Sequence, residues 1–321
     1  MNSSDLRQLH TEFMSYSKYA RQASAKTLRD YQNVFHLLTK RYPDLSSDMI
    51  TPEVLVDFFK WLQTRERIVG RGLVRQGVKK TTVATYWRKL SKFFAWLVTK
   101  GLLQSNPLQN GSMEFPKIRY DDRQYLSRAD VQRIFLAVSS GIQWNNRLIR
   151  TRNLAIISVG VFCGLRRGEL LALKLADIDL PHGRLLVRGE TSKSQMSRTI
   201  PLNVQVKQHL ADYLDERVGQ KALYTTPALW VASNKDAPLT SDGLRHVIAV
   251  IRAESKVKFH LHQLRHTFAV NFLHNSGHNS FKLQSLLGQR SIASAAVYTR
   301  CLPPEMVQAD IERMGKFENM L

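Results

Sequence analysis

Apolar residues recur every three or four positions through the first hundred residues, which is the spacing of amphipathic helices. The three clearest stretches are Leu28–Leu38, Val54–Leu62 and Val83–Leu97. Thr51 and Pro52 precede the second stretch and supply a side-chain cap and a proline for the first helical position, both of which mark a helix start. No strand-like alternation competes with the helical spacing here. The pattern therefore predicts an N-terminal domain built from helices.

The helical spacing lapses between Ser105 and Asp122, where proline, glycine and serine interrupt the apolar residues. This composition is typical of a linker. A chain of 321 residues is also long enough for two compact domains, each with its own core. We therefore expect a helical domain at 1–110, a linker at 111–124 and a second domain at 125–321.

The second domain is predicted to contain helices and a short stretch of β-strands. Ser127 and Asp130 have the spacing of a capping box, and an apolar helix is predicted from about Arg150 to Cys163. Two strand-like runs, Leu185–Val187 and Arg198–Leu202, flank a polar segment and predict a β-hairpin. Helical spacing then resumes. The expected fold class is mainly α with a small β-sheet or hairpin, in two domains.

The chain carries 47 basic and 26 acidic side chains, a formal charge of +21, and its sequence pI is about 10.2. Residues 1–112 have 18 basic and 8 acidic side chains, and residues 113–321 have 29 and 18, so both halves are basic. A distributed excess favours two folded units that each face a polyanion, as a clamp does, over a basic tail; a merely basic soluble protein is the alternative. The two cysteines have no partner at disulfide or zinc spacing, and the longest apolar run, Leu154–Leu165, is too short to span a bilayer.

Two pairs of polar residues stand at predicted helix starts. Gly164 ends one helix, and Arg166 and Glu169 then lie three apart on one face of the next, where the glutamate can orient the arginine. His262 and Arg265 have the same spacing at the start of an apolar helix and can together grip one phosphate. Either pair alone is more typical of a surface ion pair or a packed histidine, so only their combination suggests chemistry.

Along the chain come, in order, an arginine, a hairpin lysine, a His-x-x-Arg pair and a tyrosine near the C-terminus. With this order the chain resembles the tyrosine recombinase (lambda-integrase-like, phage integrase) family over essentially its whole length. The catalytic positions that the resemblance implies are Arg166 in GLRRGEL, Lys193 in the hairpin, His262 and Arg265 in HQLRH, Gln289 in LLGQRS and the nucleophile Tyr298 in AAVYTR. Arg198 competes with Lys193 for the hairpin position, and Glu169 and His266 are expected to support the site.

Gln289 departs from the family pattern, which has histidine, or sometimes tryptophan, nine residues before the nucleophile. A glutamine amide donates hydrogen bonds but does not titrate at working pH. The resemblance therefore leaves Gln289 a phosphate-binding or packing role and excludes proton transfer.

The resemblance implies a site-specific recombinase that cleaves and rejoins DNA. It also implies that 1–110 is a core-binding (SAM-like) DNA-binding domain and that 125–321 is a catalytic domain with the C-terminal nucleophile and a tail helix. Tyr298 would attack the phosphorus to give a 3′-phosphotyrosine, two arginines would stabilise the transition state, and Lys193 would protonate the leaving 5′-hydroxyl, with exchange through a Holliday junction. No cofactor or metal is expected, and a metal nuclease built on Asp177, Asp179 and Glu190 is the weaker hypothesis, because such acids commonly shape turns.

The implied partners are double-stranded DNA with an inverted-repeat core site, three further copies of the chain in a homotetramer that exchanges C-terminal tails, and accessory DNA-bending proteins. No membrane is expected, and the expected location is the bacterial cytoplasm, at the nucleoid. The tail segment Pro303–Met314 either docks on a neighbouring protomer or packs in cis. Two alternatives stay open: a type IB topoisomerase-like enzyme that relaxes DNA, and a catalytically inactive DNA-binding protein.

Overall fold

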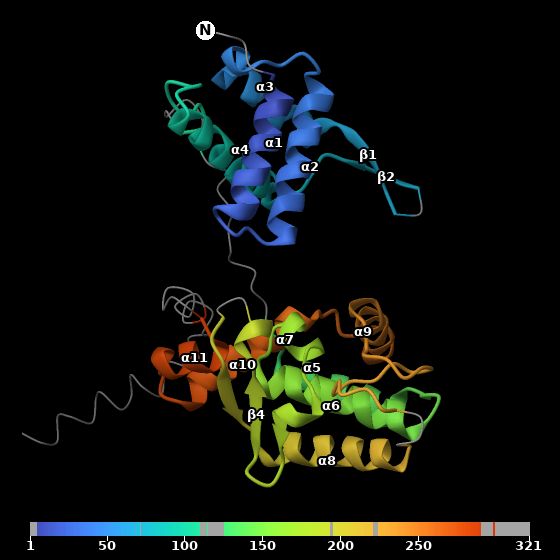
Figure 1. Cartoon of the computed structure of the whole chain (residues 1–321). Coiled ribbons are helices and arrows are strands. Elements are labelled where there is room, and N and C mark those ends of the chain that lie inside the picture. The colour runs from blue at the N-terminus through green and yellow to red at the C-terminus, as the bar shows by residue number, and fades with distance from the viewer. Residues whose placement is uncertain are drawn as a thin grey trace, which may run out of the picture. The chain divides into compact units, whose positions relative to one another are not determined.

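The computed structural model describes residues 5–70, 72–109, 114, 125–192, 195–220, 224–289 and 298. The chain forms two compact units, Met1–Tyr120 and Asp121–Leu321 (Figure 1). The predicted linker, 111–124, lies outside the described residues except for Glu114.

The N-terminal unit is a bundle of helices, as the apolar spacing predicts. Its helices are α1 (Leu6–Tyr19), α2 (Ala25–Arg41), α3 (Pro52–Thr64) and α4 (Lys80–Thr99), with a short 3-10 turn at Ser47–Met49. The Thr51 side chain accepts a hydrogen bond from the backbone of Val54 and Pro52 opens α3, so the predicted helix start is confirmed. Aromatic rings fill the core, where Phe93 of α4 meets Phe13 and Phe35 edge to face.

A β-hairpin between α3 and α4 was not expected from the sequence. Strands β1 (Glu66–Val69) and β2 (Leu73–Gln76) pair in antiparallel register. Neither face of the hairpin is buried, so its side chains do not alternate between apolar and polar and the spacing gave no signal. Glycines shape it: Gly72 has φ 79°, and a Cβ on Gly77, with φ 59°, would overlap the Gln63 carbonyl.

The second unit contains seven described α-helices and one three-stranded sheet. The helices are α5 (Arg128–Leu136), α6 (Arg147–Cys163), α7 (Arg167–Leu171), α8 (Val204–Gly219), α9 (Ser241–Ser255), α10 (Leu261–Asn275) and α11 (Ser280–Leu287). The strands are β3 (Ile178–Asp179), β4 (Arg184–Val187) and β5 (Arg198–Pro201), antiparallel in that order. The predicted hairpin is thus confirmed as β4 and β5, with β3 added beside β4.

Helix α6 runs through the middle of this unit and packs against both α8 and α10 (Figure 1). Its residues are buried on nearly all sides, as the apolar run predicts. The helix ends at Gly164, whose φ of 63° suits glycine, and a Cβ there would overlap the ring of Phe268. The predicted capping box of Ser127 and Asp130 also forms, at the start of α5. This fold places the loop after α6, the start of α10 and the end of α11 around one small volume.

None of the helices in the described part of the chain has both the length and the apolar character needed to cross a membrane.

Candidate active site

Glu169 of α7 lies at the centre of a cluster of arginines and is 1% exposed. It accepts hydrogen bonds from the backbone N of Arg166 at 2.9 Å and from Arg166 Nη1 at 2.7 Å. Arg198 donates through both Nη atoms, at 3.2 and 2.7 Å. Arg265 Nη1 is 3.8 Å from the same carboxylate. One buried anion therefore orients three cations, and the predicted support of Arg166 by Glu169 is confirmed.

Burial alone would raise the pKa of the Glu169 carboxyl, because it disfavours the charged form. The hydrogen bonds from Arg198 and from the Arg166 backbone outweigh burial and lower the pKa to about 2. Glu169 is thus ionised at any pH at which the protein would work.

Arg265 of α10 is 2% exposed and bridges two chain segments. Its Nη1 donates to the carbonyl of Gly164 at 2.7 Å and its Nη2 to the carbonyl of Leu287 at 3.0 Å. Burial, followed by the charge of Arg166, lowers the pKa of the guanidinium to about 10, which leaves it protonated at neutral pH. Arg166 keeps 26% of its side chain exposed, so it remains open to an anionic ligand.

From the sequence, Arg198 of β5 is only a rival to Lys193 for the hairpin position. Its contact with Glu169 in the arginine cluster is not predicted. Its side chain is 7% exposed. Its Nε donates to the carbonyl of Leu286 at 2.7 Å, while both Nη atoms bind Glu169. The alternation of the strand could have indicated this contact, because Arg198 lies on the same face as the buried Ile200. An arginine on a buried face needs an anionic partner. Lys193 itself lies outside the described residues.

Tyr298 is 3% exposed and packs among the apolar side chains of α10 and α11. Its ring lies 5.3 Å from that of His266, and a Tyr298 phenolate would favour the charged form of Arg265. His262 is exposed, and its ring meets the ring of His266 edge to face at 4.4 Å. The chain therefore brings Arg166, His262, Arg265 and Tyr298 together from segments far apart in the sequence.

Gln289 lies beside this cluster, directly after Gly288, whose carbonyl is 3.4 Å from Arg166 Nη2. Gln284 holds the backbone of Gln289 with two hydrogen bonds of 3.1 Å. Its carbonyl accepts from the Gln289 backbone N, and its side-chain Nε2 donates to the Gln289 carbonyl. The Gln289 Oε1 is buried and meets no hydrogen-bond donor within the part of the chain that the structure describes. This oxygen can only accept a hydrogen bond, so any contact of Gln289 with a phosphate oxygen would have to come from its amide N–H groups.

The carboxylates of the weaker metal hypothesis serve local structure. Asp177 accepts from the backbone of Lys174 at 2.8 Å and pairs with Arg188 at 3.2 Å. Asp179 binds His182 across a turn, and Glu190 is 70% exposed. Asp177 and Asp179 therefore shape turns.

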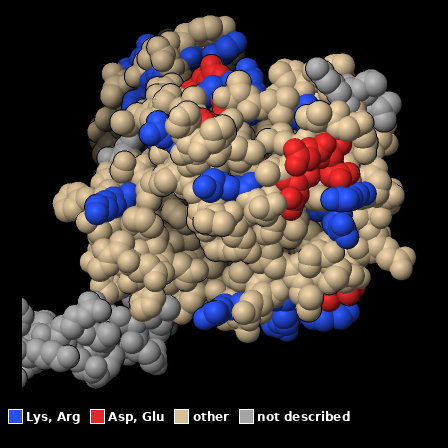
Figure 2. All heavy atoms as spheres, turned by 90° about the horizontal axis from the view of Figure 1, so that it is seen from below, with Lys and Arg blue, Asp and Glu red and all other residues tan. Residues whose placement is uncertain are grey.

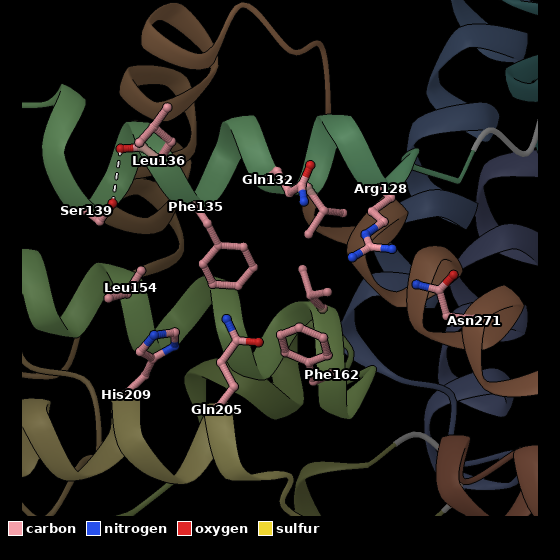
Figure 3. A pocket seen from close by; sticks show the side chains of 12 residues that line it. Arg128, Gln132, Phe135, Leu136, Ser139, Leu154, Phe162, Gln205, His209 and Asn271 are labelled. Atoms are coloured by element: carbon pink, nitrogen blue, oxygen red, sulfur yellow. Dashed lines mark hydrogen bonds between the residues drawn. The ribbon is translucent and has the colours of Figure 1, made fainter. Parts of the chain in front are cut away.

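A groove of about 680 Å³ lies on the second unit between α5, α6, α8 and α10 (Figure 3). Phe135, Leu154 and Phe162 give it an apolar lining, with polar groups such as His209 and Asn271 around them. Its lining residues include no member of the arginine and tyrosine cluster.

Figure 2 shows a face on which basic side chains are scattered and stand next to acidic ones. The second unit also has exposed ion pairs, of which Arg147 and Glu216 form one at 2.8 Å. Mixed charge of this kind does not suit a DNA backbone.

Solved structures share the fold. The lambda integrase tetramer bound to a Holliday junction superimposes with a TM-score of 0.68 at 21% identity, covering 92% of this chain and 78% of that one. The Tn1549 transposon integrase in complex with a circular intermediate DNA gives a TM-score of 0.72 at 15% identity, covering 95% and 98%.

Sequence comparisons extend the likeness to both units. Tyrosine recombinase XerC of Listeria monocytogenes serotype 4b (strain F2365) is 28% identical over 300 residues, which cover 91% of this chain and 92% of XerC. The phage integrase SAM-like domain matches residues 9–114, and the phage integrase family model matches residues 124–303. The class that the fold and the cluster define is that of tyrosine recombinases, enzymes that transfer DNA strands. The chain belongs to the phage integrase family, whose model covers more than half of it.

Proposed function

We propose that this chain is a site-specific recombinase that cleaves duplex DNA with the hydroxyl of Tyr298, forms a 3′-phosphotyrosine and exchanges strands through a Holliday junction. The observation that carries this proposal is that Arg166 and Arg265 reach the adjacent carbonyls of Gly288 and Leu287, and that Tyr298 packs in the same apolar cluster as Leu287. A phenol has an ordinary pKa near 10, so its attack on a phosphodiester needs fixed positive charge around the phosphorus. The cluster supplies that charge from preorganised groups.

Each residue has a distinct role in this scheme. Arg166 and Arg265 bind the non-bridging phosphate oxygens, and their planar forks suit two oxygens at once. His262, which is exposed next to His266, hydrogen bonds the phosphate or moves a proton. Gln289 donates its amide to the phosphate. Lys193 protonates the departing 5′-hydroxyl.

Arg198 is proposed to position the site, not to protonate the leaving group, because its guanidinium is already engaged by Glu169 and Leu286. DNA with sulfur at the 5′-bridging position separates these roles, since a thiolate leaves without a proton. Lys193→Ala is expected to slow cleavage of ordinary DNA by about 10²–10⁴-fold and to recover on the sulfur substrate. Arg198→Ala should be slow on both. Recovery of Arg198→Ala, with none for Lys193→Ala, would reverse the assignment.

The proposed assembly is a homotetramer on an inverted-repeat core site, in which each chain donates Pro303–Met314 to a neighbour. That segment lies outside the described residues, and its apolar Val307, Ile311 and Met314 have helical spacing. The apolar groove between α5, α6, α8 and α10 is the proposed acceptor. Accessory DNA-bending proteins would assist, and the chain would act in the bacterial cytoplasm at the nucleoid.

A plasmid assay tests this function against its two alternatives. The DNA site is first selected from random duplexes with the full chain, and two copies are then placed in one supercoiled plasmid. A recombinase gives deletion or inversion products and four-way junctions. Relaxation without two-site products would favour the type IB topoisomerase, and binding without any covalent chemistry would favour the inactive DNA-binding protein.

A further inference from the structure

The hairpin of β1 and β2 projects from the helices of the N-terminal unit (Figure 1). It leaves large apolar side chains in solvent. Ile68, Leu73 and Val74 are 77%, 59% and 58% exposed. Ile68 and Val74 lie opposite each other across the strands. Exposed apolar side chains gathered on so short an element mark a contact surface.

The same hairpin carries charge that nothing in the described structure neutralises. Arg67 and Arg75 are cross-strand partners, and like charges in this position destabilise a hairpin. Neither pairs with a carboxylate among the described residues, although Arg67 Nε donates to the carbonyl of Gly77 at 2.6 Å. Residues 65–80 hold six basic side chains and one acidic one, Glu66. An anionic partner would relieve this repulsion.

We propose that the hairpin is a DNA-reading element that lies in the major groove of the recombination site. A two-stranded ribbon fits that groove. Arg67 and Arg75 share one face and would reach phosphates at the edge of the groove. Ile68 and Val74, on the opposite face, would meet base edges, where a thymine methyl group offers an apolar contact.

A second copy of the chain fits this surface less well. Pairing of two hairpins edge to edge would bring Arg67 and Arg75 of both copies together, and strands of four residues offer few backbone hydrogen bonds. Phosphates complement the arginines, whereas another copy repels them.

Salt dependence of DNA binding tests the arginines. The inference rests on the proposed function only in requiring that the chain binds DNA. The salt dependence is therefore measured in the non-cleaving Tyr298→Phe background. Each neutralised phosphate contributes about 0.9 to the slope of log affinity against log salt. The double variant Arg67→Ala with Arg75→Ala is therefore expected to lower that slope by about 2 on the selected site.

The matched control removes two arginines that already face acids on the surface of the second unit. Arg147 pairs with Glu216 and Arg245 with Asp242. Arg147→Ala with Arg245→Ala should leave the salt slope unchanged. An unchanged slope in the hairpin variant, while the parent still binds the site, would overturn the hairpin's role without touching the function of the chain.

The apolar face needs its own variant. Ile68→Ser with Val74→Ser should keep the salt slope, lower the preference for the selected site over random duplex by about tenfold, and shorten the protected DNA in a hydroxyl-radical footprint. If this variant changed only self-association in sedimentation experiments, the hairpin would be a protein interface instead.

Discussion

Replacement of Arg265 by lysine is expected to slow strand cleavage by about a thousandfold, the size of effect seen when one preorganised donor to a developing anion is lost. Arg265 uses two nitrogens to hold the carbonyls of Gly164 and Leu287. A lysine has one point charge and cannot hold both carbonyls while it also faces a phosphate. Single-turnover cleavage of a nicked duplex bearing the selected site measures the effect.

Arg252→Lys is the control for this substitution, because Arg252 is exposed on α9 and stands outside the cluster. Its cleavage rate should match that of the parent. A cleavage rate for Arg265→Lys within tenfold of the parent would mean that the fork of Arg265 does not stabilise the transition state.

Loss of the central anion is expected to have the largest effect on stability. Glu169→Gln leaves the buried Arg198 and Arg265 without their counter-charge, and removal of one partner from a buried ion pair costs about 3–5 kcal/mol of unfolding free energy. Glu216→Gln breaks the exposed pair with Arg147 and should cost no more than about 1 kcal/mol. Denaturant titration of the second unit's unfolding transition compares the two variants. Equal losses of unfolding free energy would contradict the central role of Glu169.

The same residue sets an acid limit. Folding lowers the pKa of Glu169 from 4.5 to about 2, so the folded state favours the ionised carboxylate. Its contribution is therefore complete above pH 4.5 and is lost as the pH falls toward 2. The stability difference between the parent and Glu169→Gln should narrow across that window, and a difference that stays constant would contradict the lowered pKa.

The helices were predictable from sequence because their signals are local. The spacing of apolar residues and the capping residues predicted α2, α3, α4 and α6. The family resemblance indicated Arg166, His262, Arg265 and Tyr298 of the candidate active site. Arg166 and Glu169 lie three apart, so their contact also follows from helical geometry.

What the sequence did not predict depends on contacts between distant segments. Arg198 joins Glu169 and Leu286, which lie 29 and 88 residues away along the chain. The hairpin at β1 and β2 has no buried face, so its strands show no alternation to detect. Its Gly70 and Gly72 on either side of residue 71, among branched aliphatic residues, were the available turn signal.

Covalent capture tests most directly whether the phenol of Tyr298 attacks DNA. A suicide duplex, nicked so that the cleaved end diffuses away, is incubated with the full chain, and the protein–DNA adduct is digested and sequenced by mass spectrometry. We predict a nucleotide joined by its 3′-phosphate to the peptide that contains Tyr298, and no adduct from Tyr298→Phe, which still binds the site. An adduct on another residue, or one that persists in Tyr298→Phe, would contradict the account.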